Sequence, residues 1–365
     1  KTSTSYELQG GLEIVKTLYG KDLHAGMFGF TVTVAGKDTA STEKLKALLR
    51  ADKDKGELVV TNEEPQADGT SHTGILGGLT FATGDVGKTF TYKVVENRED
   101  KRGYTYDSAY WTVAITVENR ADGSLYTVTT VKHYDAKNVE LSKDKKTYSS
   151  VDGTAKAQVS FTNSYSATGT FEGLAAQKVM DSSDKIEAGQ YTFDLYAEKA
   201  DGSLEKMDEG TTQASDNGKA TVDFGKVYFK LGNAPGESHE QTVDLAGAVK
   251  DGLATKQHNA DHTTTYSFNL VAKERLAKLP DGVRPVDTSA TCRVLLEVTD
   301  NNDGTLTPKV TYRNGTENGK IVFHNTRDKV KTIGTVAKPD VNIDGQLLSV
   351  GDSYVYTINW VNTEA

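Results

Sequence analysis

The chain has 365 residues, a formal net charge of −9 and a single cysteine, Cys292. The acidic balance argues against nucleic acid or an anionic membrane surface as the main partner. No apolar run approaches the roughly 20 residues that span a bilayer, and one cysteine excludes both an intrachain disulfide and a cysteine-based zinc site. No signal peptide begins at Lys1, so we expect a mature chain or an excised piece of a longer one.

The first predicted strand, residues 12–19, raises a question about a buried charge. Alternate side chains of a strand point to the same side. One face of this strand therefore carries Leu12, Ile14, Lys16 and Leu18. An ammonium group buried in such an aliphatic stripe without a partner costs several kcal/mol or loses its proton. Lys16 therefore needs a partner elsewhere in the chain.

Two short helices interrupt an otherwise strand-like pattern. Residues 41–51 carry leucines at helical spacing behind a plausible Ser or Thr cap, and residues 243–253 look similar. Asp122-Gly123 and Asp303-Gly304 are hairpin dipeptides between strand-like runs. The pattern favours a mainly β fold of tandem Ig-like (CnaB-like) β-sandwich domains with short helical insertions.

The second half of the sequence repeats the first. The segment "GLEIVKTLYGKDLHAGMFGFTVTV" from Gly11 resembles "GLAAQKVMDSSDKIEAGQYTFDLY" from Gly173, and later segments match in the same order. Repeats of roughly 160 residues are whole domains rather than solenoid turns. We predict one domain over residues 1–167, a second over 168–328 and the start of a third over 329–365.

Each repeat places three polar residues on apolar stripes. In the first repeat Glu96 follows Phe90, Tyr92 and Val94 on one face, and Asn163 follows Val159 and Phe161. The six polar residues are Lys16, Glu96 and Asn163 in the first repeat and Lys178, Glu274 and Asn325 in the second. The separation from lysine to asparagine is 147 in both (163 − 16 and 325 − 178). The separation from lysine to glutamate is 80 in the first and 96 in the second, with the extra residues in the loop around "KLGNAPGESHEQ".

Taken one at a time, these residues have ordinary explanations. A lysine at a strand end usually extends its ammonium to water, a glutamate there is usually solvated, and an asparagine often forms a turn. Their recurrence in one order favours a shared buried site. Two buried Lys–Glu ion pairs, each with a hydrogen-bonded asparagine, would also explain the pattern without any chemistry.

The residue types also suit a reaction. Burial lowers the pKa of a lysine and raises that of a glutamate, so a neutral amine and a protonated acid become accessible. The acid can polarise the asparagine carbonyl, the amine can attack its carbon, and the acid can pass protons to the departing ammonia. The predicted products are the isopeptide bonds Lys16–Asn163 and Lys178–Asn325, assisted by Glu96 and Glu274. Each domain would react once, which is self-maturation and not enzymatic turnover.

The two halves resemble the intramolecular isopeptide-bond domains of Gram-positive shaft pilins and cell-wall adhesins. The matching motifs are "LEIVK", "FTYKVVE" and "VSFTN" in the first half and "LAAQK", "SFNLVAKE" and "IVFHN" in the second. The resemblance implies an extracellular, surface-anchored stalk or shaft without a cofactor, whose anchor lies outside this segment. Its expected partners are further domains of the same adhesin, pilus subunits and a host-surface ligand, with no nucleic acid and no membrane insertion in this segment.

The last segment resembles the opening of another adhesin domain, in which Lys338 would be the lysine; we interpret residues 329–365 as truncated because no later glutamate or asparagine pairs with it. No sorting signal or pilin lysine motif is present, which favours an adhesin stalk slightly over a polymerising pilin.

Other patterns are weaker. His258 and His262 lack a third ligand, and residues 300–306 fit a hairpin better than an EF-hand, so we expect no metal site. Two other function classes stay open: a β-sandwich module that itself binds a host glycan or protein, and a glycan-active enzyme. The enzyme ranks last because no catalytic carboxylate pair is recognisable.

Overall fold

A computed structural model of the protein describes residues 5–8, 12–151, 156–234, 241–286, 290–314, 316–317, 319–327, 331–335 and 354–358. The chain divides into two compact units. The first comprises Lys1–Ala167 with Leu231–Ala234, and the second comprises Thr168–Lys230 with Pro235–Ala365. No helix within the described ranges is long and apolar enough to cross a membrane.

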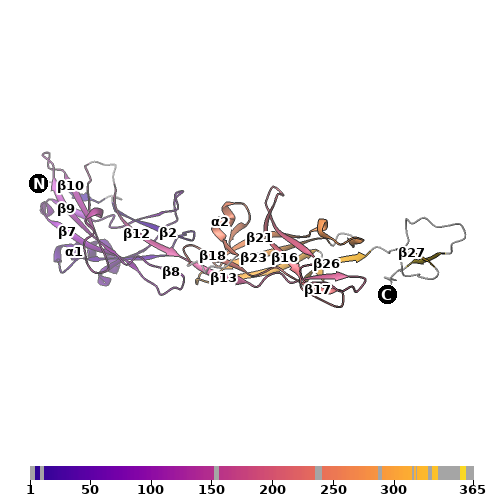
Figure 1. Ribbon diagram of the computed structural model, residues 1–365. Helices are drawn as coiled ribbons and strands as arrows, with labels where there is room; N and C mark the ends of the chain where they lie inside the picture. Colours follow the sequence, from indigo (N-terminus) through magenta and orange to yellow (C-terminus); the bar gives the residue numbers. More distant parts are fainter. Residues whose placement is uncertain are drawn as a thin grey trace. The chain divides into compact units, whose positions relative to one another are not determined.

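The first unit is a β-sandwich (Figure 1). One sheet has the order β11-β10-β9-β7-β3-β4 and the other has the order β5-β2-β12-β8, with β1 and β6 forming a separate pair. The strands are β1 (Ser5–Glu7), β2 (Leu12–Tyr19), β3 (Gly29–Val34), β4 (Glu57–Thr61), β5 (Ser71–Gly74), β6 (Thr80–Ala82), β7 (Thr89–Asn97), β8 (Tyr104–Thr105), β9 (Tyr110–Asn119), β10 (Leu125–Tyr134), β11 (Lys146–Ser149) and β12 (Ala157–Tyr165).

The first long strand of this unit lies beside its last. β2 and β12 run parallel, with Lys16 opposite Phe161 and Leu18 opposite Asn163. The even-numbered side chains of β2 and the odd-numbered side chains of β12 are buried, and they alternate with more exposed neighbours, as the sequence pattern predicted. Parallel pairing of neighbours in space requires a long connection, and here that connection is nearly the whole domain.

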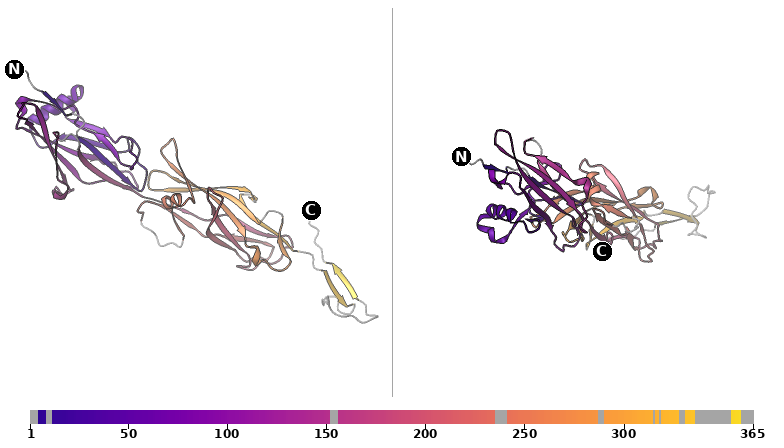
Figure 2. Two further views of the ribbon diagram at one scale, coloured as in Figure 1. Left: turned by 90° about the horizontal axis from the view of Figure 1, so that it is seen from above. Right: turned by 90° about the vertical axis from the view of Figure 1, so that its left-hand side faces the viewer.

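The helix α1 (Thr39–Leu49) covers part of this sandwich and packs on β7, β3 and β4 (Figures 1 and 2). The predicted Ser or Thr cap is wrong. Asp38 is the N-cap, and its carboxylate accepts from the Ser41 N–H at 2.7 Å. Ser41 is fully buried, and its hydroxyl accepts from the Thr91 N–H at 3.0 Å, so it ties the helix to β7.

The second unit joins most of its strands into one eleven-stranded sheet. Its order is β22-β26-β14-β17-β16-β15-β21-β23-β24, with β20 on β21 and β25 on β26; β13, β18 and β19 form a smaller sheet. The strands are β13 (Ala167–Phe171), β14 (Ala176–Met180), β15 (Thr192–Glu198), β16 (Leu204–Thr212), β17 (Lys219–Asp223), β18 (Val227–Leu231), β19 (Thr242–Asp244), β20 (Thr255–His258), β21 (Thr264–Glu274), β22 (Val283–Pro285), β23 (Thr291–Asp300), β24 (Leu306–Asn314), β25 (Thr316–Glu317) and β26 (Lys320–Arg327).

The two units share the pairing of the strands that carry their lysine and asparagine. β14 and β26 are parallel, with Lys178 opposite Phe323 and Met180 opposite Asn325. This register reproduces that of β2 and β12 residue for residue. The prediction of a mainly β fold with tandem sandwich domains and short helical insertions is confirmed.

Local predictions hold with small differences. Both hairpin dipeptides lie between paired strands, and their glycines Gly123 and Gly304 adopt the positive φ angles of 83° and 81° that such turns require. The second helix, α2 (Leu245–Lys250), is shorter than predicted. Glycine has poor helix propensity, and Gly252 has a φ of 75°, which is incompatible with a continuing helix.

Short helical turns and a terminal hairpin complete the described chain. The 3-10 helices are η1 (Arg50–Lys55), η2 (Thr83–Asp85), η3 (Ser142–Asp144) and η4 (Leu276–Lys278). In the predicted third segment, β27 (Lys331–Thr335) and β28 (Tyr354–Ile358) pair antiparallel. Lys338 lies outside the described residues, so its predicted role stays a prediction.

Candidate cross-linking sites

The three polar residues of the first repeat meet in the core of its sandwich. Lys16 comes from β2 and Asn163 from β12, which are neighbours in one sheet. Glu96 comes from β7 in the facing sheet, opposite Phe30 of β3. The exposed fractions are 0% for Lys16, 6% for Glu96 and 1% for Asn163. We call these three residues the first cluster.

One carboxylate oxygen joins the other two residues of this cluster. The Lys16 Nζ lies 2.7 Å from the Glu96 Oε1. The Asn163 Nδ2 donates to the same oxygen at 2.9 Å. The amine and the amide therefore both contact one carboxylate oxygen, and intramolecular reactions benefit when groups are held near one another in this way.

Burial shifts the protonation of both ionisable groups towards neutrality. Desolvation lowers the pKa of Lys16 to about 8, although the Glu96 carboxylate opposes the shift. Desolvation likewise raises the pKa of Glu96, against the opposing influence of Lys16. A proton passed from the ammonium to the carboxylate would yield a neutral amine and a neutral acid, and the low-dielectric core favours such an exchange.

The asparagine carbonyl of the first cluster has a partner that the sequence did not reveal. The backbone N–H of Asp107 donates to the Asn163 Oδ1 at 2.7 Å. The predicted mechanism assigned polarisation of this carbonyl to the glutamate. In the structure the amide has the opposite orientation, with its nitrogen on Glu96, because an ionised carboxylate accepts hydrogen bonds and cannot donate them.

The second repeat builds the same arrangement, which we call the second cluster. Lys178, Glu274 and Asn325 are 0%, 5% and 0% exposed. The Lys178 Nζ donates to the Glu274 Oε1 at 2.6 Å, and the Asn325 Nδ2 donates to the same oxygen at 3.0 Å. Desolvation lowers the pKa of Lys178 to about 8. Among the described residues, the Asn325 Oδ1 accepts no hydrogen bond.

Aromatic rings enclose the lysine of each cluster. The Lys16 Nζ lies 4.5 Å from the centre of the Phe28 ring, and the Lys178 Nζ lies 4.8 Å from that of Tyr191. Sequence reasoning missed these rings. The signal was present, since Phe28 and Tyr191 each stand two residues before a buried phenylalanine at the start of a strand.

A second pair of rings lies beside each cluster, at neighbouring strand positions. Phe30 and Phe161 lie 5.2 Å apart between ring centres, and Phe193 and Phe323 lie 4.2 Å apart. All four rings are fully buried. They come from the strand positions opposite the glutamate or the lysine, and they help to exclude water from the cluster.

The weaker sequence candidates do not form a site. His258 and His262 are both exposed, on opposite sides of the turn that joins β20 to β21. Asp303 lies in the β23–β24 turn, where its carboxylate accepts from the Thr305 N–H at 3.0 Å. Within the described part of the chain, no three His, Cys, Asp or Glu side chains are grouped as metal ligands.

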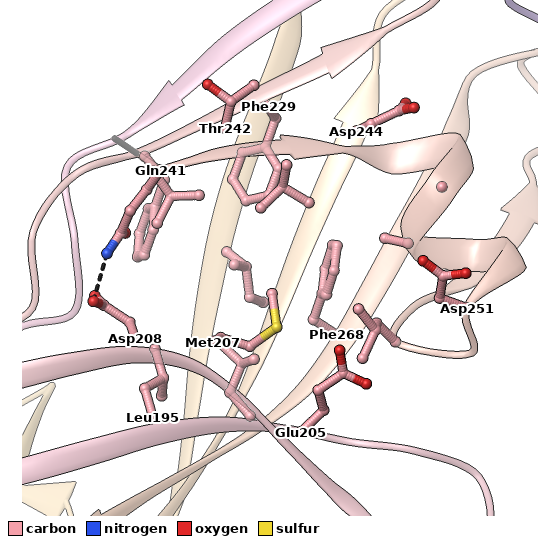
Figure 3. A pocket seen from close by; sticks show the side chains of 18 of the residues that line it. Leu195, Glu205, Met207, Asp208, Phe229, Gln241, Thr242, Asp244, Asp251 and Phe268 are labelled. Carbon is pink, nitrogen blue, oxygen red and sulfur yellow. Dashed lines mark hydrogen bonds between the residues drawn. The ribbon is translucent and has the colours of Figure 1, made fainter. Parts of the chain in front are cut away.

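A separate cavity of about 450 Å³ lies within the second unit (Figure 3). Its walls come from β16, β18, β19 and α2, and Met207, Phe229 and Phe268 contribute apolar surface. Glu205 and Asp251 also line the cavity, and Gln241 contacts Asp208 at one side. No member of either cluster lines this cavity, so it plays no part in the arrangement described above.

Comparison with known families gives a direct match. The family described as "Spy0128-like isopeptide containing domain" (FctA) matches residues 12–166 and again residues 174–328. The chain belongs to this family. The resemblance inferred from the sequence is thereby confirmed. The predicted structural, non-enzymatic role of a pilus-shaft type follows from that membership, and the alternative of a ligand-binding module is not favoured.

Solved structures similar to this Spy0128-like chain include three pilins. The major pilin T-13 from Streptococcus pyogenes shows 13% identity and a TM-score of 0.23, over 89% of this chain and 99% of that one. Another major pilin from Streptococcus pyogenes shows 15% identity and a TM-score of 0.24, over 87% and 98%. The SpaE basal pilin from Lactobacillus rhamnosus GG shows 12% identity and a TM-score of 0.20, over 90% and 100%. No curated protein matched the sequence.

Proposed function

We propose that this chain is a structural segment of a surface pilus or adhesin stalk, and that each of its two domains locks itself with one lysine–asparagine isopeptide bond. The bonds join Lys16 to Asn163 and Lys178 to Asn325. Glu96 and Glu274 carry the protons in the respective clusters. The observation that supports the proposal most is the same buried set of three residues, built twice in one register.

The reaction begins with the ion pair. Glu96 accepts a proton from the Lys16 ammonium, 2.7 Å away, which leaves a neutral amine beside a protonated acid. The amine nitrogen attacks the Cγ of Asn163, and the electron pair of the carbonyl moves to Oδ1. Because folding already holds both groups on the same Glu96 oxygen, the reaction avoids most of the entropy loss that slows a bimolecular reaction.

The tetrahedral intermediate then collapses. Glu96 takes the second proton from the former amine and gives a proton to Nδ2, which already lies 2.9 Å from its Oε1. The Cγ–Nδ2 bond breaks, ammonia leaves, and the bond between Lys16 Nζ and Cγ remains. Each bond releases one ammonia, consumes no cofactor and forms once. The same steps apply to Lys178, Glu274 and Asn325.

The proposed setting follows from the chemistry of the bond. An amide does not respond to reductant, so this reinforcement suits an extracellular chain with one cysteine. The proposed neighbours are further domains of the same protein or other subunits of the assembly. Anchoring to the cell wall, and contact with a host surface, belong to the proposal and are not needed for the cross-linking itself.

Intact mass under denaturing conditions tests the proposal. The protein is expected to be lighter than its sequence mass by two molecules of ammonia. After proteolysis, two branched peptides should join Lys16 to Asn163 and Lys178 to Asn325. A full sequence mass would mean that the clusters are buried ion pairs without chemistry, and the proposed function would then be wrong.

A further inference from the structure

The loop between β8 and β9 holds the asparagine of the first cluster from outside the sheet. β8 pairs with β12 only at Ser164 and Tyr165, so the edge of β12 continues unpaired beside Asn163. Asp107 occupies that position. Its backbone N–H donates to the Asn163 Oδ1, and its carboxylate accepts from the Thr162 N–H at 3.0 Å.

The same loop is fixed on both sides of this contact. The other oxygen of the Asp107 carboxylate accepts from the Ala109 N–H at 2.9 Å, which closes a tight turn. The Trp111 indole donates to the Ser160 carbonyl at 2.8 Å. Towards the other end, the Ser166 N–H donates to the Gly103 carbonyl at 2.9 Å. The N–H of Asp107 is therefore aimed at the amide oxygen by contacts that do not involve the reacting groups.

We infer that the backbone N–H of Asp107 is the oxyanion donor for the first isopeptide bond, and that the Asp107 carboxylate positions it. This inference rests on the proposed function. As the Lys16 amine adds to Cγ, negative charge develops on Oδ1, and a fixed donor at that oxygen stabilises the charge more than it stabilises the starting amide. The two residues then have separate roles. The Asp107 N–H stabilises the charge on the oxygen, and Glu96 transfers protons from the lysine nitrogen and to the leaving nitrogen.

This division explains the orientation of the amide. With Oδ1 on the Asp107 N–H, Nδ2 points to Glu96, which is where the leaving nitrogen must receive its proton. The opposite orientation would place the leaving nitrogen against another N–H donor and away from any acid. The inference concerns the first domain alone. In the second repeat the strand pairing gives the corresponding position to Val286, and its N–H donates to the His324 carbonyl at 2.8 Å instead of to the asparagine side chain.

The test uses the rate of bond formation in the second domain as an internal reference. The full chain is synthesised in a cell-free system, samples are quenched in acidic denaturant at timed intervals, and the two branched peptides are quantified after digestion. An ester replacing the peptide bond between Tyr106 and Asp107 removes the N–H and keeps the carboxylate. Loss of one oxyanion donor typically slows a reaction by about 100-fold to 1,000-fold. The rate of the Lys16–Asn163 bond relative to that of the Lys178–Asn325 bond should therefore fall by that factor from its value in the unmodified chain.

A second variant addresses the carboxylate. Asp107→Ala keeps the N–H but frees the loop, and it should slow the first bond while leaving the second unchanged. The matched control is Asp122→Ala, with an ester at Asp122 as the chemical control. Asp122 accepts from the Ser124 N–H at 2.9 Å in the exposed β9–β10 turn, outside both clusters. Neither control should change the ratio of the two bonds.

The outcomes separate the two claims. If the ester at Asp107 leaves the ratio unchanged, the oxyanion role is refuted, even though both bonds form. If neither branched peptide appears in the unmodified chain, the proposed function itself fails. Should Asp107→Ala leave the first domain unfolded, the ester variant, which retains every side chain, decides the question.

Discussion

Removing the amide of the first cluster should lower the stability of the first domain by a large and calculable amount. Asn163→Ala prevents the bond but keeps the Lys16–Glu96 ion pair. The bond closes a loop of 147 residues (163 − 16). The chain-entropy relation for cross-links, derived for disulfides, gives about 5 kcal/mol for a loop of that length.

A second contribution comes from the group that loses its partner. In Asn163→Ala the part-buried backbone N–H of Asp107 loses its acceptor at Oδ1, and leaving such a donor unpaired costs up to about 1–3 kcal/mol. The total is about 6–8 kcal/mol. At 2–4 °C per kcal/mol for a domain of this size, the midpoint of thermal unfolding should fall by roughly 10–30 °C.

Differential scanning calorimetry of the full chain measures this change. Asn325→Ala should lower the transition of the second domain instead, which assigns the two transitions. Asn119→Ala, at an exposed strand end, is the matched control and should leave both midpoints within a few degrees. If Asn163→Ala melted like Asn119→Ala, the bond either would not form or would not stabilise the domain, and the reasoning from loop length would be refuted.

Three further predictions follow from the same geometry. Glu274→Gln should abolish only the Lys178–Asn325 bond, so the intact mass should show the loss of one ammonia and peptide mapping should find one branched peptide. The control Glu297→Gln should leave both bonds. Loss of both bonds in Glu274→Gln would contradict the independence of the two sites. In unlinked Asn163→Ala, urea titrations should show that the free energy of unfolding rises between about pH 8 and pH 10.5, by up to about 1.4 kcal/mol per pH unit. The reason is that the unfolded chain binds a proton which the buried Lys16 has lost in this pH range. A flat profile, or the same rise when Lys16→Met is added, would argue against the lowered pKa of Lys16. Under tension, the linked first domain should extend little, whereas Asn163→Ala should release roughly 500 Å of chain, and equal extension of both would show that the bond bears no load.

Much of the site could be predicted because strand parity is a strict rule. Lys16 and Asn163 fall on stripes whose apolar members are buried, so their own burial followed directly. The equal lysine-to-asparagine separation in both repeats reflects the identical register of the parallel pairs β2–β12 and β14–β26. The glutamate separations differ because Glu96 and Glu274 stand on strands, β7 and β21, that are not paired with the lysine strand and that loops of different length precede.

Other features left no trace in the sequence pattern. A backbone N–H belongs to every residue except proline, so nothing in the letter Asp107 shows that its amide faces Asn163. The N-cap of α1 was misassigned because Asp38, Thr39 and Ser41 all suit a cap, and only packing reveals that Ser41 is needed at β7. The joining of the second unit into one sheet likewise depends on β16, which pairs with both β15 and β17.

Because β2 is the first long strand of its domain and β12 the last, the three residues of the first cluster are synthesised in a fixed order. A chain made from its N-terminus presents Lys16 first and Glu96 next, so the amine and its acid can meet while the amide is still missing. Asn163 follows Lys16 by 147 residues, which at 5–20 residues per second is roughly 7–30 s of synthesis. Asn163 lies on β12, the last strand of this domain to be synthesised. The proposed bond therefore requires the whole domain to be made, and its detection would show that β12 had taken its place beside β2.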